Sequence, residues 1–226
     1  MLEDQAPSLL DLDHARHDGR LRCVTGPAPD AAPSTVVGAV LAGGRSRRMG
    51  GAKALAELGG RPLISYPLAA VSAAVLDPVV VAKSDSPLPQ LDCPVLREPA
   101  RPSHPLCGVI AALRASGDRP VVVVGCDMPF VTGPLLAWLA SLDGLVVPEV
   151  EGRPQPLLAR YEPAHAGALE VALRRGDSMR EAVAGLGPRI VDERELGRFG
   201  DPSRLFFNVN HPSDLSAAER LLPRGG

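Results

Sequence analysis

Apolar residues occur along this chain in two patterns, short continuous runs and longer runs that repeat every three to four positions. The continuous runs lie at Val36 to Leu41 and at 79–82, 95–96, 120–124, 146–147 and 156–161, and they predict strands covered on both faces. The periodic runs predict helices at 65–76, 105–113, 132–142, 164–174, 177–185 and 212–222. Their alternation predicts an α/β fold, a single-domain three-layer αβα arrangement around a mostly parallel, Rossmann-like sheet.

Local signals set the expected limits of these elements. Ser65 is expected to cap the first helix, Thr132 with the proline two positions later is expected to start the third, and Trp138 is expected to pack in the core. A short strand is expected at 206–211. Residues 1–35 combine several prolines with scattered charges, so they are interpreted as a poorly ordered leader before a domain at 36–222.

Composition narrows the classes of partner. The 226 residues are 45% hydrophobic, which suits one domain with a sizeable core, and the formal net charge of −2 gives no bulk attraction to nucleic acid or to an anionic membrane. Only 3% of the residues are aromatic, the four cysteines form no C-x-x-C pair, and the N-terminal stretch lacks an apolar signal segment. We therefore expect a cytoplasmic protein that binds neither nucleic acid nor membrane.

The loop after the first predicted strand has the composition of a phosphate cradle. Gly43 and Gly44 allow backbone N–H groups to approach an anion, while three arginines, Arg48 among them, and Lys53 supply positive charge. The pattern matches neither G-x-G-x-x-G nor the P-loop G-x-x-x-x-G-K-[ST]. A triphosphate is the ligand that it favours, and a glycine-rich turn with solvated arginines is the alternative.

A carboxylate follows the most strand-like run of the chain. Asp127 comes directly after 120–124, and open parallel sheets bind ligands outside the carboxyl ends of their strands, so Asp127 and the glycine loop are expected to face one crevice. Mg²⁺ is often held by one or two carboxylates together with phosphate oxygens. Asp127 is thus the first candidate for a metal ligand, and Lys53 is the candidate phosphate contact; a turn-forming aspartate and an exposed lysine are the alternatives.

The order of these residues resembles a known family. Leu41-Ala42-Gly43-Gly44-x-Ser46-x-Arg48-Met49-Gly50-x-x-Lys53 looks like the signature of the nucleotidyltransferases that include molybdenum cofactor guanylyltransferase. Pro105-Leu106-x-Gly108, Cys126-Asp127-Met128-Pro129, Gln155-Pro156-Leu157-x-Ala159-x-Tyr161 and Phe207-Asn208-Val209-Asn210-x-Pro212-x-Asp214-Leu215 follow in the family's order. The resemblance covers about four-fifths of the chain and implies a sheet of the nucleotide-diphospho-sugar transferase type.

The resemblance also implies roles for individual residues. The nucleotide would be bound by Leu41, Ala42, Gly43, Gly44, Lys53, Glu98 and Asp127, with Lys53, Arg48 and Asp127 as catalytic residues. Asp127 and Asn210 would hold Mg²⁺, with Asn208 as the alternative to Asn210. The implied reaction transfers GMP from GTP to the terminal phosphate of molybdopterin and releases pyrophosphate. Molybdoenzymes or other cofactor-synthesis proteins are the expected partners beyond these substrates.

Several positions depart from the family's pattern, and they concern base recognition. Ala52 stands where an aspartate usually precedes the lysine, and Ala82 stands where a polar base-contacting residue occurs. Glu98 replaces an aspartate and could instead be a solvated loop carboxylate, and His104 and His211 replace glycine and threonine. Gly43 favours GTP over CTP, because the cytidylyl branch typically has alanine there and a purine needs more room.

Two alternatives therefore stay open. The first is a cytidylyltransferase or another nucleotidyltransferase that acts on a different phosphorylated acceptor, because a fold does not determine the acceptor. The second is a non-catalytic nucleotide-binding protein with a regulatory or assembly role, which the presence of Lys53 and Asp127 disfavours.

Overall fold

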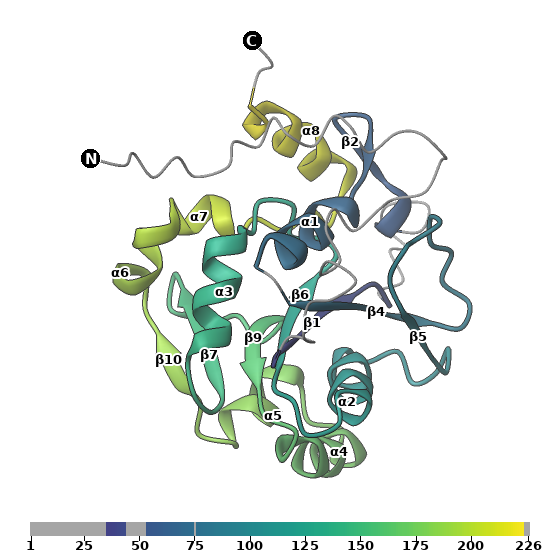
Figure 1. Cartoon of the computed structure of the whole chain (residues 1–226), viewed down its shortest axis with the longest axis vertical. Coiled ribbons are helices and arrows are strands. Elements are labelled where there is room, and N and C mark those ends of the chain that lie inside the picture. The colour runs from purple at the N-terminus through teal and green to yellow at the C-terminus, as the bar shows by residue number, and fades with distance from the viewer. Residues whose placement is uncertain (1–34, 44–52, 75, 224–226) are drawn as a thin grey trace.

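A computed structural model describes residues 35–43, 53–74 and 76–223 of the chain (Figure 1). The elements in order are β1 (Val37–Leu41), η3 (Lys53–Leu55), β2 (Glu57–Leu58), β3 (Arg61–Pro62), α1 (Ser65–Ala73), β4 (Asp77–Lys83), β5 (Val95–Glu98), α2 (Pro105–Ala115), β6 (Val121–Gly125), α3 (Gly133–Ser141), β7 (Val146–Val150), β8 (Arg153–Pro154), β9 (Leu158–Tyr161), α4 (His165–Arg175), α5 (Met179–Ala184), β10 (Arg189–Val191), α6 (Glu193–Leu196), η4 (Gly197–Phe199), α7 (Pro202–Leu205) and α8 (Pro212–Leu221).

The described strands form one large sheet and one small hairpin. The large sheet has eight strands, in the order β10-β7-β9-β6-β1-β4-β5, with β8 paired to β7. Strands β5, β4, β1 and β6 run parallel, whereas β9 is antiparallel to both β6 and β7. The carboxyl ends of β6, β1, β4 and β5 therefore lie side by side along one edge of the sheet. The predicted mostly parallel sheet is confirmed.

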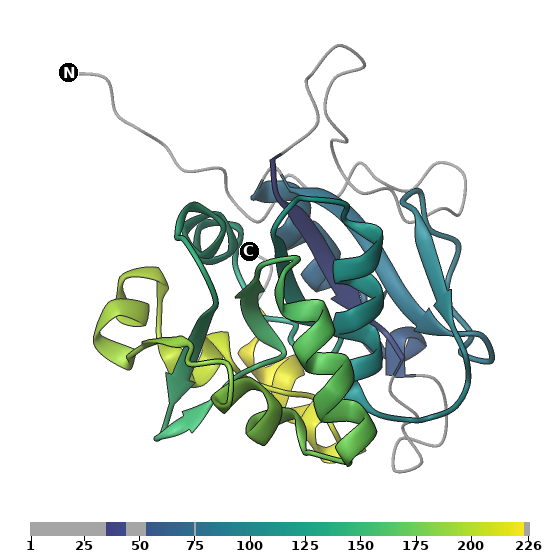
Figure 2. The ribbon, with the colours of Figure 1, turned by 90° about the horizontal axis from the view of Figure 1, so that it is seen from below.

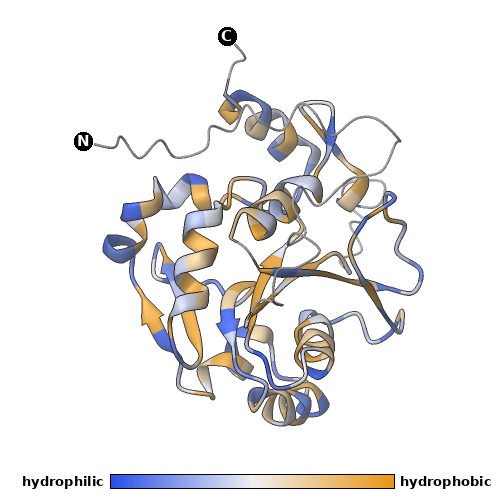
Figure 3. Cartoon of the chain, viewed as in Figure 1, coloured by the Kyte–Doolittle hydropathy of each residue, from blue (hydrophilic) through white to orange (hydrophobic). Residues whose placement is uncertain are grey.

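Helices cover both faces of this sheet, which explains why its strands are continuously apolar. Val40 of β1 and Val124 of β6 belong to the buried cluster that includes α1 and α3, while Ala39 and Val123, their neighbours in sequence, belong to the cluster that includes α2, α4 and α5. Successive side chains of a strand point to opposite faces, so both sets must be apolar. Figure 2 shows the sheet between its two helical layers, and Figure 3 shows hydrophobic residues concentrated in the strands and in α3.

A smaller core joins the end of the chain to the segment that follows the glycine loop. Leu58 and Leu63, from the β2–β3 hairpin region, pack with Val209 and with Ala218 of α8, and all four side chains are buried. Helix α8 and strand β2 are adjacent in Figure 1. This cluster brings Lys53 and the loop before α8 to the carboxyl edge of the large sheet.

Two expectations about local structure were wrong. Ser65 does not cap α1: the N-cap is Ile64, and the buried Oγ of Ser65 has no hydrogen-bond partner among the described residues. The segment 206–211 forms no strand, because no strand of the described residues pairs with it; it runs as a loop from α7 to α8. The β2–β3 hairpin, β8, β10 and the short helices α6 and α7 were not expected.

Other expectations have different outcomes. Trp138 is partly buried and packs against the α1–α3 cluster. The predicted leader lies almost entirely outside the described residues, so its interpretation stays a prediction. No helix within residues 35–43, 53–74 and 76–223 is long and apolar enough to cross a membrane.

Candidate functional site

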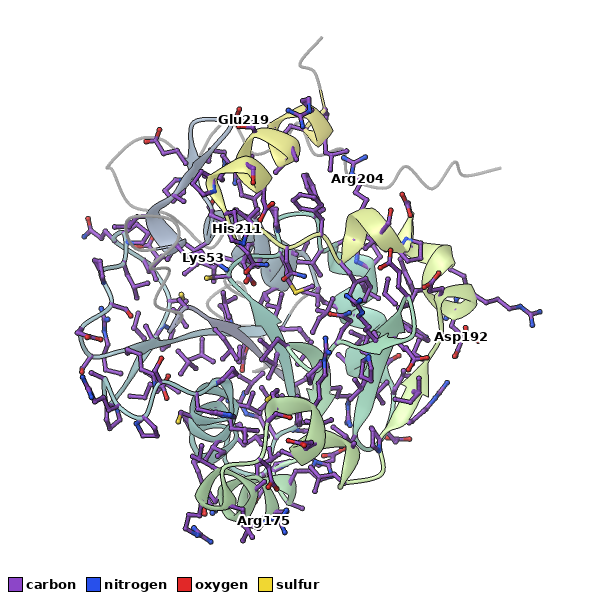
Figure 4. The ribbon with its side chains drawn as sticks, turned by 180° about the vertical axis from the view of Figure 1, so that it is seen from behind. Lys53, Arg175, Asp192, Arg204, His211 and Glu219 are labelled. Atoms are coloured by element: carbon purple, nitrogen blue, oxygen red, sulfur yellow. The ribbon has the colours of Figure 1, made fainter. Side chains whose placement is uncertain are left out.

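Three predicted site residues meet at the carboxyl edge of the sheet, although up to 157 positions separate them in sequence. The Nζ of Lys53 lies 2.7 Å from Oδ2 of Asp127 and 2.8 Å from Oδ1 of Asn210. The side chains of Lys53 and Asp127 are 12% and 21% exposed, so the ion pair is partly desolvated yet open to a ligand. Figure 4 shows Lys53 beside His211, directly below α8.

Asp127 is held by backbone contacts on both sides. The amide of Cys126 donates to the carbonyl oxygen of Leu41 at 3.0 Å, which extends the pairing of β6 with β1 by one step, and the amide of Val209 donates to the carbonyl of Asp127 at 2.9 Å. A Cβ at Gly125 would overlap Oδ1 of Asp127. A side chain at residue 125 would therefore displace this carboxylate from its position over the end of β6.

Asn210 is positioned by the first turn of α8. One carboxylate oxygen of Asp214 accepts hydrogen bonds from the backbone amides of Asn210 and His211, each at 2.8 Å. Desolvation raises the pKa of Asp214, but these two donors, together with the charges of His211 and Lys53, outweigh it and leave the pKa below its usual value. The alternative metal ligand, Asn208, instead donates its side-chain amide to the carbonyl of Phe206 at 2.8 Å.

Lys53 begins the 3₁₀ turn η3, and Ala54 anchors this turn to the rest of the domain. The side chain of Ala54 is buried, and the backbone carbonyl of Ala54 accepts a hydrogen bond from the amide of Ile64 at 3.3 Å. The amide of Ala56 donates to the carbonyl of Lys53 at 3.1 Å. These contacts aim the lysine side chain across the gap toward β6 and α8.

A second cluster of polar groups lies farther along the same edge. Lys83 and Glu98 end the adjacent strands β4 and β5, where they are register partners, and their Nζ and Oε2 atoms are 3.1 Å apart. Glu98 is buried, so the alternative of a solvated loop carboxylate is wrong. A Cβ at Gly43 would lie 3.0 Å from Oε1 of Glu98 and 3.4 Å from Cγ of Lys83, so this glycine packs directly on the pair.

The remaining predicted residues have mixed outcomes. Leu41 is partly buried and faces Gly108 of α2, where a Cβ would meet Cδ2 of Leu41 at 3.3 Å. The side chain of Ala42 is buried, so only its backbone could face a nucleotide. Gly44 and Arg48 lie outside the described residues.

Sequence reasoning missed Lys83 and misjudged its neighbour. Ala82 is completely buried in the α1–α3 cluster, so its side chain packs in the core and is not exposed at the site. The next residue, Lys83, is a buried charged residue at the carboxyl end of β4. Its signal was available: a lysine directly ends a run of four apolar residues, 79–82, that forms a strand buried on both faces.

The neighbouring Cys126 does not offer a nucleophile. Burial, and after it the negative charge of Asp127, raises the pKa of the Cys126 thiol to about 12. The thiol therefore stays protonated near neutral pH, and the thiolate is the reactive form. Among the described residues, Lys53 could stabilise negative charge, and the oxygens of Asp127 and Asn210 could bind a metal ion.

The donor set of the site fits a hard divalent cation. Within the described residues no three His, Cys, Asp or Glu side chains gather to form a complete metal centre. Asp127 and Asn210 instead present one carboxylate and one amide oxygen to the same point, where the ammonium group of Lys53 contacts both. Mg²⁺ commonly takes one or two protein oxygens and completes its shell with water and phosphate.

Comparisons with known proteins identify the family to which the chain is similar. Residues 38–190 match the family model described as MobA-like NTP transferase domain. A protein of Cereibacter sphaeroides named molybdenum cofactor guanylyltransferase is 37% identical over 193 residues, which cover 82% of this chain and 96% of that protein.

Solved structures extend the comparison to the fold. Molybdopterin-guanine dinucleotide biosynthesis protein A from Archaeoglobus fulgidus aligns with a TM-score of 0.68 at 29% identity, over 81% of this chain and 97% of its own. The 2-C-methyl-D-erythritol 4-phosphate cytidylyltransferase of Thermus thermophilus aligns with a TM-score of 0.58 at 23% identity, over 82% and 98% of the two chains, and shows a shared fold. The predicted fold of the nucleotide-diphospho-sugar transferase type is confirmed.

Proposed function

The chain belongs to the MobA-like NTP transferase domain family, and from that premise we propose that it transfers GMP from GTP to the terminal phosphate of molybdopterin, releasing pyrophosphate. Relatives named molybdenum cofactor guanylyltransferase support a guanylyltransferase role in synthesis of this cofactor. The observation that carries the proposal is the meeting of Lys53, Asp127 and Asn210 at the carboxyl edge of the sheet. That edge is where open α/β sheets bind their ligands.

The reaction needs one bond to form and one to break at the α-phosphorus of GTP. An oxygen of the acceptor phosphate forms a bond to that phosphorus, and the bond to the bridging oxygen breaks, so pyrophosphate leaves with the electron pair. Lys53 would contact the phosphates and stabilise the negative charge that develops during transfer, because its ammonium group is partly desolvated and fixed in direction. Arg48 is proposed as a second cation for the phosphates.

Asp127 and Asn210 would hold Mg²⁺, with Asp214 fixing the loop that carries Asn210. Bound there, the ion would neutralise phosphate charge and orient the triphosphate. Lys53 contacts both oxygen donors in the described structure, so we infer that it gives up at least one of these contacts when nucleotide and metal bind, and turns to the phosphates.

The guanine nucleotide would lie along the carboxyl ends of β6, β1, β4 and β5. Its phosphates would face Lys53 and Asp127, and its base would face Gly43 and Glu98, with Leu41, Ala42 and Gly44 lining the space between. The alternative of cytidylyl transfer rests on the shared fold alone. Molybdopterin or its molybdenum form is the proposed acceptor, and the proposed compartment is the cytoplasm.

A product assay tests the function directly. We expect the protein, given Mg²⁺, molybdopterin and each nucleoside triphosphate separately, to release pyrophosphate fastest with GTP and to yield a product whose mass is that of molybdopterin plus GMP. Preference for CTP would replace the guanylyl assignment with a cytidylyl one. Tight GTP binding with no pyrophosphate release would favour a non-catalytic nucleotide-binding protein.

Asp127→Asn is the matched negative control for this assay. The amide keeps the shape of the side chain but loses the charge that would hold the metal, so we expect turnover to fall about a hundredfold or more with little change in stability. Asp118 lies in the exposed turn before β6, at the amino end of that strand and away from the site, so Asp118→Asn should keep wild-type turnover. Wild-type rates and magnesium dependence in Asp127→Asn would reject the metal-ligand assignment.

A further inference from the structure

Lys83 and Glu98 form a buried ion pair, and such a pair is weak evidence for a role in stability. The side chains are 4% and 8% exposed, and Nζ of Lys83 donates to the carbonyl of Pro102 at 2.8 Å in addition to its contact with Glu98. Desolvating two charges offsets most of their attraction, and well-packed apolar residues often stabilise a protein as much or more. A role other than stability is therefore worth seeking for this pair.

The pair lies where a ligand would bind, and among the described residues only one oxygen of Glu98 contacts Lys83. Lys83 contacts Oε2 of Glu98, whereas Oε1 faces Gly43 and Gly108. A Cβ would lie 3.0 Å from Oε1 at Gly43 and 3.8 Å from it at Gly108, so two glycines flank this atom. An ionised carboxylate only accepts hydrogen bonds, and this oxygen is thus a fixed acceptor at the carboxyl edge.

Position along the sheet relates this acceptor to the catalytic residues. Asp127 follows β6, Gly43 follows β1, and Lys83 and Glu98 end β4 and β5, which is the order of neighbouring strands. Three strand spacings of ~4.8 Å separate β6 from β5, about 14 Å in all. With the α-phosphate near Lys53 and Asp127, Glu98 lies toward the base end of the nucleotide.

On the basis of the proposed function, we propose that Lys83 is a positioning residue for base selection: it holds Glu98 so that Oε1 accepts a hydrogen bond from the N1–H and 2-amino edge of guanine. Adenine and cytosine present an unprotonated ring nitrogen at the corresponding position. That nitrogen needs a hydrogen-bond donor, and an ionised carboxylate has no proton to donate. A site built around one fixed acceptor discriminates strongly, because the wrong base leaves the buried group unpaired.

The fold supplies a matched control at the other end of the strands, beside the amino end of β6. Arg160 of β9 is 4% exposed and pairs with Glu162, with Nη1 and Oε1 2.5 Å apart. Because β9 runs antiparallel to β6 and Tyr161 is the register partner of Val121, this pair lies at the amino end of β6, away from Asp127. Removing it tests the loss of a buried cation without any contact with the nucleotide.

The test measures equilibrium binding of GTP, ATP and CTP, each with Mg²⁺, to the wild type and to Lys83→Met, Glu98→Gln, the double variant Lys83→Met/Glu98→Gln and Arg160→Met. We expect the wild type to prefer GTP, and Lys83→Met to weaken GTP binding roughly tenfold while ATP binding changes less than about twofold. Arg160→Met should lower stability and leave the GTP-to-ATP ratio unchanged. The double variant should lose no more selectivity than Glu98→Gln alone, because Lys83 acts through Glu98.

Three results would overturn the proposal: a folded Lys83→Met with the wild-type GTP-to-ATP ratio, a double variant whose loss equals the two single losses multiplied, or a wild type that does not distinguish the three nucleotides. If Lys83→Met does not fold, the double variant decides, since it buries no unpaired charge; a retained GTP preference there overturns the proposal. A GTP preference that depends on Lys83, together with no pyrophosphate release with molybdopterin, would reject the proposed reaction and leave this inference standing.

Discussion

Two lysines at one edge of the sheet show how burial decides what a residue can do. Lys53 is 12% exposed and contacts two oxygen donors that a metal would also use, so its contacts can be exchanged when a ligand binds. Lys83 is 4% exposed, and it contacts the carboxylate of Glu98 and the backbone carbonyl of Pro102 in this buried position. The first is suited to a changing role during reaction, the second to holding a partner still.

Lys53→Ala is expected to slow the chemical step more than it weakens binding. Loss of a charge contact that strengthens in the transition state costs a few kcal/mol, which should appear as a large fall in kcat with a smaller rise in KM for GTP. Steady-state kinetics over a range of GTP concentrations measures both constants. A rise in KM with unchanged kcat would show that Lys53 assists only ground-state binding.

At the scale of elements, the first turn of α8 positions Asn210, which lies just before the helix. Asp214 accepts from the amides of Asn210 and His211, so one carboxylate both caps the helix and fixes the loop that faces Lys53. The pKa of Asp214 is lowered, so its contribution to stability is present above the usual aspartate pKa of ~3.9 and is lost as pH falls through the lower folded value.

Asp214→Asn is expected to reduce both stability and turnover. Loss of the charged cap costs about 1 kcal/mol, and looser placement of Asn210 should lower kcat several-fold. Asp192→Asn is the matched control, because Asp192 caps α6 by accepting from the amide of Glu195 at 2.9 Å and lies far from Lys53 in Figure 4. Urea unfolding and turnover are measured for both; equal turnover in the two variants would separate Asp214 from the site.

The packing of β1 against α1 gives a prediction about stability alone. A Cβ at Gly38 would overlap a methyl group of Val71, so Gly38→Ala should destabilise the protein by about 1–3 kcal/mol. Gly167, on the exposed face of α4, has open space around its Cβ position, and Gly167→Ala should be neutral or stabilise by up to about 1 kcal/mol. Urea unfolding compares them, and a stable Gly38→Ala would mean that α1 can move away from β1.

For the whole molecule, the predicted leader remains to be tested by truncation. Residues 1–33 carry prolines and scattered charges without the periodicity of an amphipathic element, so their removal is expected to leave turnover and melting temperature nearly unchanged. The truncated chain would still contain β1 and every element after it. An insoluble product, or a melting temperature lowered by more than a few degrees, would show that this segment packs on the domain.

Much of this fold was readable from local sequence. Strands β1, β4 and β6 are built around continuous apolar runs, because helices cover both faces of the sheet, and α2 begins at the predicted proline. Short elements escaped prediction for a physical reason. The two-residue strands β2 and β3 and the four-residue helices α6 and α7 are too short to carry a period, and tertiary contacts stabilise them.

By itself, the sequence determined the α/β class, the most strongly patterned strands and the residue types of a candidate site for phosphate and metal, because periodicity and residue chemistry are local properties. Only the tertiary structure decided which polar residues meet. It joined Lys53 to Asn210 across 157 positions, directed the side-chain amide of Asn208 to the carbonyl of Phe206, and placed Ala82 in the core and Lys83 against Glu98. Strand order and the alternation of faces decide those meetings, and both depend on how distant segments pair.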